Sequence, residues 1–262
     1  MSASPTPSTV PSGSRITCSI SDGIADVRLD RPDKLNALSL DMLGELRATA
    51  RRLGRTPGLR AVVVSGNGRS FCAGLDLGAA ARNPVAVARA FVPTPRGTNL
   101  FQEACWAWRR LPVPVIAAVH GHVLGAGVQI ALAADLRLTT PDARWCVKEV
   151  ERGLVPDMSG IRALTQLVGI ETAKRLTFTA EEFTGADAGR LGLAGTVTDS
   201  PLDEAFALAG RIAERRPEAV AAAKRLFDRR WSSGDRRTFA AERWAQLRLL
   251  PGAMKPLRHS AK

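Results

Sequence analysis

Apolar and polar positions alternate in two short segments near the start of the chain. Residues 15–20 (RITCSI) and 24–29 (IADVRL) follow this period of two and are separated by a Ser-Asp-Gly turn. Alternation is typical of a strand with one buried face, and a glycine turn between two such strands indicates a hairpin. The sequence therefore predicts a β-hairpin over residues 15–29.

A helical period follows the hairpin. Ser39 is a residue type that caps helix starts and Gly54 is one that ends helices, and the apolar positions between them recur on one helical face. These positions are Leu43, Leu46, Ala50 and Leu53. We expect one amphipathic helix between residues 39 and 54.

Three later apolar runs predict buried strands, because they are short and bounded by turn residues. They are AVVVSG (61–66), PVIAAVHG (114–121) and LRLTT (136–140). Two helices are expected among them, one over residues 99–110 and one opened by glycines within LGAGVQIALAAD (124–135). The stretch from Gly78 to Thr98 lacks a period, and we expect a mobile loop with at most one helical turn.

Helices dominate the rest of the chain, and we expect them over residues 160–168, 171–178, 203–214 and 217–231. Strand–helix alternation followed by helices favours an α/β layered core with a helical C-terminal region. We divide the chain into a disordered Ser/Pro-rich tail over residues 1–13, a core domain over 14–200 and a C-terminal helical region over 201–262.

The composition is that of a globular protein. Of the 262 residues, 45% are hydrophobic, which excludes a fully disordered chain. The four cysteines form no C-x-x-C pair, so neither a disulfide framework nor a structural zinc site is indicated. No apolar run reaches the roughly 20 residues of a membrane span, and the first dozen residues do not resemble a signal peptide. We expect a cytoplasmic protein.

Charge narrows the choice of partner. Lys and Arg number 37 against 25 Asp and Glu, and the net charge of +12 favours a polyanionic ligand such as nucleic acid or a phosphate-rich cofactor. Most of the excess lies in residues 211–262, where 14 basic residues stand against 5 acidic ones. A solvated helical face explains such a segment equally well, and no nucleic-acid-binding motif is visible.

Two glycine-rich segments carry candidate chemistry. They are SGNGRSFCAGLD (65–76) and HGHVLGAGVQ (120–129), and each leads from a predicted strand toward a helix. Exposed amides at such turns carry partial positive charge, and two that converge can hold an oxyanion. The nucleotide-binding alternatives fail, because Ile130 breaks G-x-G-x-x-G after Gly125 and no P-loop motif occurs. Either segment alone can also be a plain tight turn.

Four segments in order resemble the crotonase family, the enoyl-CoA hydratase/isomerase superfamily. They are RPDKLNALS, FCAGLDL, AAVHGHVLGAGVQIALAADLRL and VKEVERGLVPDMSG, and the resemblance covers residues 15–235. It implies an α/β crotonase (ClpP-like) fold with a ββα-repeat core and a C-terminal helical trimerisation region. It also implies an acyl-CoA thioester substrate, a homotrimer or dimer of trimers, no metal, and no cofactor beyond the coenzyme A of the substrate.

The resemblance assigns binding groups as well. The thioester oxygen is expected between the main-chain amides of Leu75 and Ala126, and the carbonyl of Ala73 is expected to face the adenine of CoA. Further substrate contacts are implied for Gly74, Asp76, Gly125, Gln129 and Trp231.

The acid/base positions depart from the hydratase pattern of the family, which has two glutamates. The first position holds Gln129, whose amide can hold a water but cannot take a proton. The second is kept as Glu149, although a plain surface carboxylate is the competing interpretation. Asp157 stands where the hydratases have glycine and the dienoyl-CoA isomerases have aspartate. It can equally cap the helix expected near Ser159.

These residues favour double-bond isomerisation of an enoyl- or dienoyl-CoA, with Glu149 and Asp157 as the catalytic carboxyl groups. Hydration with Glu149 as the sole acid/base group is the alternative within the enzyme class. A second class is an RNA-binding protein of crotonase fold, for which residues 211–262 supply a basic surface, although nucleic acid is the less expected partner. His120 and His122 have no third ligand at a spacing that would make a metal site.

Overall fold

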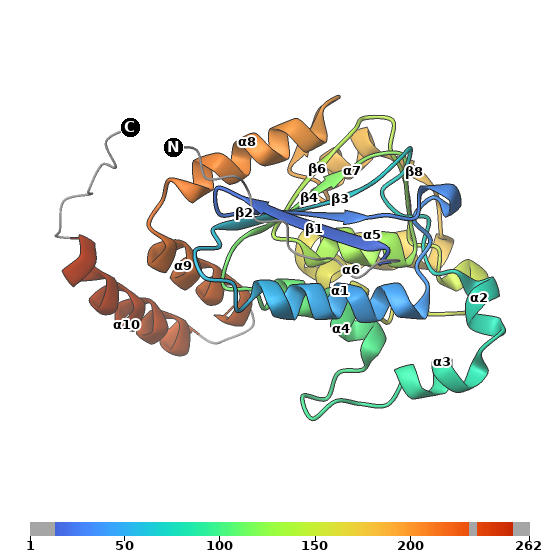
Figure 1. The fold of residues 1–262 in the computed structure, drawn as a ribbon, viewed down its shortest axis with the longest axis horizontal. Helices are drawn as coiled ribbons and strands as arrows, with labels where there is room; N and C mark the ends of the chain where they lie inside the picture. Colours follow the sequence, from blue (N-terminus) through green and yellow to red (C-terminus); the bar gives the residue numbers. More distant parts are fainter. Residues whose placement is uncertain (1–13, 231–234, 254–262) are drawn as a thin grey trace.

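The computed structural model describes residues 14–230 and 235–253, so the expected N-terminal tail lies outside the described residues. Six strands form the larger sheet, in the order β1-β2-β3-β4-β6-β9 (Figure 1). They are β1 (Ile16–Ser21), β2 (Ile24–Leu29), β3 (Ala61–Gly66), β4 (Val115–Val119), β6 (Leu136–Thr139) and β9 (Thr196–Val197). β1 and β2 are antiparallel, and the remaining neighbours are parallel. The predicted hairpin and the three predicted strands are confirmed.

A second, smaller sheet contains three short strands in the order β5-β7-β8. They are β5 (His122–Leu124), β7 (Arg144–Cys146) and β8 (Phe183–Thr184). β5 and β7 are parallel, whereas β7 and β8 are antiparallel. Both sheets are therefore mixed.

The helices are α1 (Leu40–Leu53), α2 (Leu77–Ala81), α3 (Pro84–Ala90), α4 (Leu100–Arg109), α5 (Ala126–Ala133), α6 (Gly160–Thr179), α7 (Gly185–Leu191), α8 (Pro201–Ala213), α9 (Pro217–Arg230) and α10 (Asp235–Ala253). Two 3-10 turns, η1 (Pro32–Lys34) and η2 (Val150–Arg152), complete the set. α1 begins as predicted, because the Ser39 side chain accepts a hydrogen bond from the Met42 N–H. The helix buries the four predicted apolar residues, Leu43, Leu46, Ala50 and Leu53.

Helices cover both faces of the larger sheet. Val62 and Val64 of β3 belong to the main core, which includes buried residues of α1, α4 and α5. Ala61 and Val63 point to the opposite face and pack in a smaller core with Ala205 of α8. Figure 1 shows α8 on one side of the sheet and α1, α4 and α5 on the other. Burial on both faces explains why these strands read as uninterrupted apolar runs.

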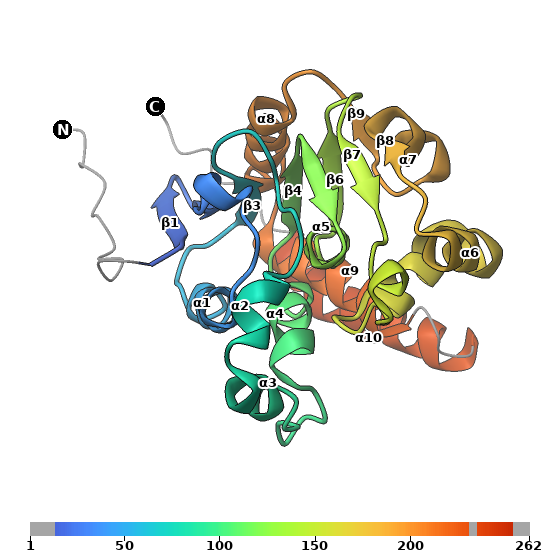
Figure 2. The ribbon, with the colours of Figure 1, turned by 90° about the vertical axis from the view of Figure 1, so that its right-hand side faces the viewer.

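The stretch from Gly78 to Thr98 was predicted as a mobile loop with at most one helical turn, and the structure has more helix there. It contains most of α2 and the whole of α3, which lies away from the sheet in Figures 1 and 2. α3 has a complete start signal, since the Asn83 side chain accepts from the Ala86 N–H and Pro84 is its first residue. The error arose because a short helix has too few turns to establish an apolar period.

The C-terminal part follows the expected helices with two differences. α6 spans both predicted segments with a break at Gly169, whose φ is 76°. α10 falls within the helical region predicted over residues 201–262, although no separate helix was specified at its position. The division at residue 200 stays a prediction, and α8, which follows it, is the helix that covers the second face of the sheet. No helix among the described residues is long and apolar enough to cross a membrane.

Candidate active site

The glycine turn of residues 72–76 is held between two other segments of the chain. On one side, the Leu38 N–H donates to the Gly74 carbonyl at 2.8 Å. On the other side, the Leu124 N–H donates to the Cys72 carbonyl at 3.0 Å. The RPDKLNALS segment, which contains Leu38, therefore positions this turn against the second glycine segment.

The two glycine turns approach each other closely. Gly74 has a φ of +99° and Gly125 a φ of +50°, conformations that residues with a side chain rarely adopt. A Cβ on Gly74 would lie 2.9 Å from the Leu124 carbonyl oxygen and 3.9 Å from the Ala126 nitrogen. The amide of Leu75, the next residue, is therefore brought to the start of α5.

The amides of Leu75 and Ala126 are both without a hydrogen-bond acceptor among the described residues. Ala126 is the first residue of α5, and the N-terminus of a helix carries partial positive charge. Two unpaired N–H donors that converge can stabilise negative charge on an oxygen atom. The two groups that the sequence predicted for an oxyanion hole thus lie at neighbouring turns.

The carboxyl group of Glu149 faces the second of these turns. A Cβ on Gly125 would lie 3.5 Å from Glu149 Oε1 and 3.9 Å from Oε2. Burial raises the pKa of Glu149, the hydrogen bond from Gln129 opposes this shift, and the charge of Asp157 raises the pKa further. Oε2 is buried and has no hydrogen-bond partner. A carboxylate with a raised pKa and an unpaired oxygen is suited to accept a proton.

Asp157 is half-buried in the segment before α6, and burial raises its pKa as well. It does not cap that helix. Ser159 is the cap residue of α6, and no side chain of the cap accepts a hydrogen bond there. The N–H groups of Met158 and Gly160 instead donate to Gln129 Oε1, at 2.8 Å and 2.9 Å. The helix-cap alternative for Asp157 is therefore wrong, which leaves its carboxyl group available for chemistry.

Gln129 joins these groups from the first turn of α5. Its side chain is buried, and Nε2 donates to Glu149 Oε1 at 2.7 Å. The sequence predicted a substrate contact for Gln129, but it did not predict the bonds of this side chain to Glu149 and to the start of α6. These partners lie 20 to 31 residues away along the chain, and no local pattern indicates them.

The remaining predicted binding residues differ in their surroundings. The Ala73 carbonyl accepts no hydrogen bond within the described part of the chain. Asp76 is already engaged, because it accepts from the Ala79 N–H at 2.9 Å and from Arg31 at 2.8 Å, and these two bonds lower its pKa. Its role as a substrate contact stays a prediction. Trp231 lies outside the described residues.

The two glycine-rich segments also contain the thiol of Cys72 and the imidazoles of His120 and His122. Burial raises the pKa of the Cys72 thiol to about 12, so it carries no thiolate at neutral pH. His122 Nδ1 lies 2.9 Å from Ser70 Oγ, and His120 Nε2 lies 2.9 Å from the Gly68 carbonyl oxygen. In the described ranges, no three His, Cys, Asp or Glu side chains are grouped as a metal site.

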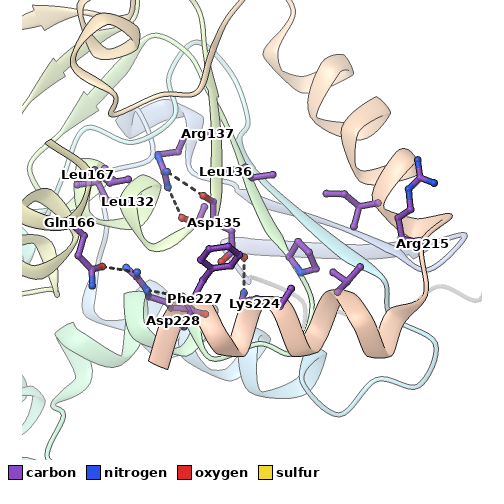
Figure 3. Close-up of a pocket in the computed structure, with 16 residues that line it drawn as sticks. Leu132, Asp135, Leu136, Arg137, Gln166, Leu167, Arg215, Lys224, Phe227 and Asp228 are labelled. Atoms are coloured by element: carbon purple, nitrogen blue, oxygen red, sulfur yellow. Dashed lines mark hydrogen bonds and ion pairs between the residues drawn. The ribbon is translucent and has the colours of Figure 1, made fainter. Parts of the chain in front are cut away.

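A cavity of about 540 Å³ lies at the other end of α5 (Figure 3). α5 has 8 residues, so its two ends are roughly 12 Å apart. The cavity shares no residue with the candidate site, and it contains charged groups that the sequence analysis did not single out. Lys224 of α9 lies 2.6 Å from Asp135, and Arg109 of α4 donates to Gln166 at 2.7 Å. The first contact joins α9 to the turn between α5 and β6, and the second joins α4 to α6.

Comparison with known proteins gives a consistent result. Residues 19–249 match the family described as enoyl-CoA hydratase/isomerase. The chain is 33% identical over 208 residues to a peroxisomal Delta(3,5)-Delta(2,4)-dienoyl-CoA isomerase of Arabidopsis thaliana, which covers 76% of this chain and 75% of the relative. It is also 33% identical over 209 residues to a short-chain-enoyl-CoA hydratase of Clostridium acetobutylicum, with 79% and 78% covered.

The length of the match varies among the relatives. The mitochondrial dienoyl-CoA isomerase of Rattus norvegicus is 35% identical, and the matched part covers 77% of this chain but 64% of that protein. Among solved structures, this chain is similar to a protein from Thermobifida fusca YX that is described as an enoyl-CoA hydratase and was solved in complex with CoA. The two have a TM-score of 0.79 and 32% sequence identity. The similarity covers 92% of this chain and 95% of that structure.

Proposed function

This chain belongs to the enoyl-CoA hydratase/isomerase family, and on that premise we propose that it isomerises a double bond of an enoyl- or dienoyl-CoA. The proposed ligand is an acyl-CoA thioester whose carbonyl oxygen accepts hydrogen bonds from the Leu75 and Ala126 amides. These donors stabilise the enolate that forms when a proton leaves C2, because charge then develops on the thioester oxygen.

Glu149 removes the proton from C2, and the electron pair moves onto the thioester oxygen. A protonated carboxyl group, Asp157 or Glu149 itself, then delivers a proton at C4. In a 3-enoyl ester the double bond thereby moves from C3–C4 to C2–C3. In a 3,5-dienoyl ester the proton is delivered at C6 instead, both double bonds move one position and the 2,4-diene forms. The substrate keeps its mass in both cases. Each carboxyl group returns to its starting state when the proton is exchanged between them or with water.

One observation carries this choice. Two half-buried carboxyl groups with raised pKa values, Glu149 and Asp157, accompany the paired amides, whereas the third polar position is the amide of Gln129. Isomerisation needs protein groups that take a proton from the acyl chain and return one to it, but it needs no bound water. The names of the Arabidopsis and rat relatives support the same reaction.

Hydration of a 2-enoyl-CoA is the second candidate, and it is favoured by the Clostridium relative. In this reaction Glu149 would have to activate a water and protonate C2 by itself. Gln129 offers little support for such a water, since its oxygen already accepts two N–H groups and one of its amide hydrogens is bonded to Glu149.

Mass spectrometry separates the two reactions. Purified protein is incubated with 2-enoyl-, 3-enoyl- and dienoyl-CoA esters, and the products are weighed and their double bonds located by ultraviolet absorbance. Isomerisation leaves the mass unchanged and moves the double bond, whereas hydration adds one water. Unchanged mass and unchanged absorbance with every ester would rule out both.

Substitution tests the proton carrier. Glu149→Gln keeps the size of the side chain and removes the base, so turnover should fall about 10²- to 10⁴-fold. Glu151→Gln is the matched control, because Glu151 lies two residues away, is exposed, and pairs with Lys148 at 3.3 Å. Wild-type turnover in Glu149→Gln would refute the proposed proton transfer.

A further inference from the structure

Gln129 is a buried polar side chain with bonds to two separate segments. Only 2% of its surface is exposed. Its Nε2 donates to Glu149 Oε1 at 2.7 Å, and its Oε1 accepts from the N–H groups of Met158 at 2.8 Å and Gly160 at 2.9 Å. It therefore links the segment of Glu149 to the segment of Asp157.

The orientation of this amide is determined by its partners. Two backbone N–H groups require an acceptor, so the oxygen must face α6 and the NH₂ group must face Glu149. An amide in the opposite orientation would set its NH₂ group against two other donors. The bond at Glu149 Oε1 therefore leaves Oε2 as the oxygen without a partner.

Gly160 makes room for this arrangement. A Cβ at position 160 would lie 2.5 Å from Gln129 Oε1 and 2.9 Å from both Cδ and Cγ. Contacts under 3.0 Å force a displacement, and the nearest atoms belong to the amide that holds Glu149. The absence of a side chain at Gly160 is thus a condition for the bond between Gln129 and Glu149.

We propose that Gln129 is the positioning residue of the active site. It holds Glu149 by Oε1 so that Oε2 receives the substrate proton. It also ties this carboxyl group to the turn that carries Asp157. The inference rests on the proposed isomerase function. A glutamate at position 129 would lack the N–H donor unless it were protonated, so the amide is the side chain that suits a two-carboxyl site here.

Other titratable groups also face Glu149 and set the background for a test by pH. The charge of Asp157, before α6, raises the pKa of Glu149. Cys105 of α4 and Cys146 of β7 interact electrostatically with Glu149, but burial raises the pKa of both thiols, and they stay neutral at working pH. Gln129 is the side chain whose hydrogen bond favours the ionised form of Glu149 and so lowers the pKa of this carboxyl group.

Gln129→Glu replaces the donor by a carboxylate. A second carboxylate at hydrogen-bond distance raises the pKa of its neighbour by about one unit or more. Glu149 must be ionised to accept a proton, so the acidic limb of the kcat profile should move to higher pH by at least about one unit. A purely structural role would lower kcat evenly across the profile without moving the limb.

Gly160→Ala tests the same bond from a residue that touches no reacting atom. The added Cβ displaces the Gln129 amide, so the acidic limb should move in the same direction by a smaller amount. Gly210→Ala is the control, since nothing lies within 4 Å of a Cβ at that position of α8. Its profile should coincide with that of the wild type.

NMR of protein labelled with ¹³C at glutamate carboxyl groups gives the pKa of Glu149 directly, with the signal assigned by its loss in Glu149→Gln. This measurement needs no substrate. If the wild type converts no ester, the proposed function fails while the raised Glu149 pKa in Gln129→Glu and Gly160→Ala still supports the bond. An unchanged Glu149 pKa in both folded variants overturns the positioning role, whatever the reaction. Should Gln129→Glu fail to fold, Gly160→Ala alone decides.

Discussion

At the scale of single residues, Glu149 combines features that oppose stability and favour chemistry. Its Oε2 is buried without a partner, and burial raises the pKa of the carboxyl group. A buried carboxylate oxygen that has lost its water costs free energy in the folded state. This cost supports the proposed role of Glu149 in the reaction, because a structural carboxylate would be paired as Glu103 is with Arg51 and Arg110.

Glu149→Gln should therefore stabilise the fold at neutral pH. The pKa of Glu149 is higher in the folded than in the unfolded chain, so the folded state binds more protons and stability falls as pH rises between the two values. Glutamine does not titrate, and the variant should have the higher Tm at pH 8, by roughly 2–4 °C for each kcal/mol relieved. The difference should shrink as pH falls below the ordinary glutamate value. Calorimetry from pH 4 to 8 measures it, and a lower Tm for the variant at pH 8 would contradict it.

At the scale of elements, the start of α5 is the part on which the candidate site depends. Gly125 precedes the helix with a φ of +50° and a ψ of −115°, and no side chain caps this end. The first amide of the helix is thus left for a ligand. A Cβ at Gly125 would lie 3.5 Å from Glu149 Oε1, so the lack of a side chain at this position keeps the start of α5 close to the Glu149 carboxyl group.

Gly125→Ala should damage both stability and activity. Alanine at this φ is strained, at a cost of about 1–3 kcal/mol, and its Cβ would lie 3.5 Å from Glu149 Oε1. Turnover should fall at least tenfold, together with a lower urea midpoint. Gly44→Ala provides a matched control in α1, where a Cβ meets nothing within 4 Å, and it should gain up to about 1 kcal/mol from helix propensity. Equal behaviour of the two variants would show that the Gly125 conformation is not required.

At the scale of the whole molecule, part of the basic C-terminal excess is structural. The side chain of Lys224 in α9 is 7% exposed and pairs with Asp135, and it also donates to the Val113 carbonyl at 3.0 Å. Figure 3 shows this pair beside the cavity, where α9 meets the turn between α5 and β6. The pair ties the C-terminal helices to the sheet. The exposed arginines of this region, among them Arg225, Arg237, Arg243 and Arg248, are left for solvent or a ligand.

Lys224→Met should destabilise the protein by about 2–4 kcal/mol, because Asp135 would keep a largely buried charge without its partner. Adding Asp135→Asn removes that charge and keeps an acceptor for the Val115 N–H, which donates to Asp135 at 2.7 Å. The double variant should recover a large part of the loss. Urea unfolding of the two single variants and the double variant measures the coupling, and strictly additive losses would show that the pair contributes nothing.

The basic surface also allows a test of the RNA-binding alternative. We expect CoA to bind and RNA to show no mobility shift at physiological salt, since the sequence shows no nucleic-acid-binding motif. The binding of labelled RNA is measured between 50 and 300 mM salt. Tight retention with a steep salt slope would indicate many phosphate contacts and would favour RNA binding.

Much of the fold could be predicted because its signals are local. Ser39 and Gly54 bound α1 as expected, and the runs at residues 61–66 and 136–140 became strands of the larger sheet. The helix over residues 84–90 was not predicted although Asn83 and Pro84 mark its start, because a helix this short shows no apolar period. α10 was anticipated only as part of the helical region over residues 201–262, and its bounds were not predicted.

For the candidate site, the sequence by itself determined which groups are available: two amides after glycine turns, the carboxyl groups of Glu149 and Asp157, and an amide at Gln129. Only the tertiary structure decided how they are connected. Gln129 bonds to Glu149 and to the first turn of α6, Gly160 leaves room for it, and Asp157 is released from capping. The physical reason is the distance along the chain over which each kind of interaction acts. Backbone conformation and helix caps depend on residues within a few positions, whereas the bonds that orient a buried side chain depend on segments brought together by packing of the core.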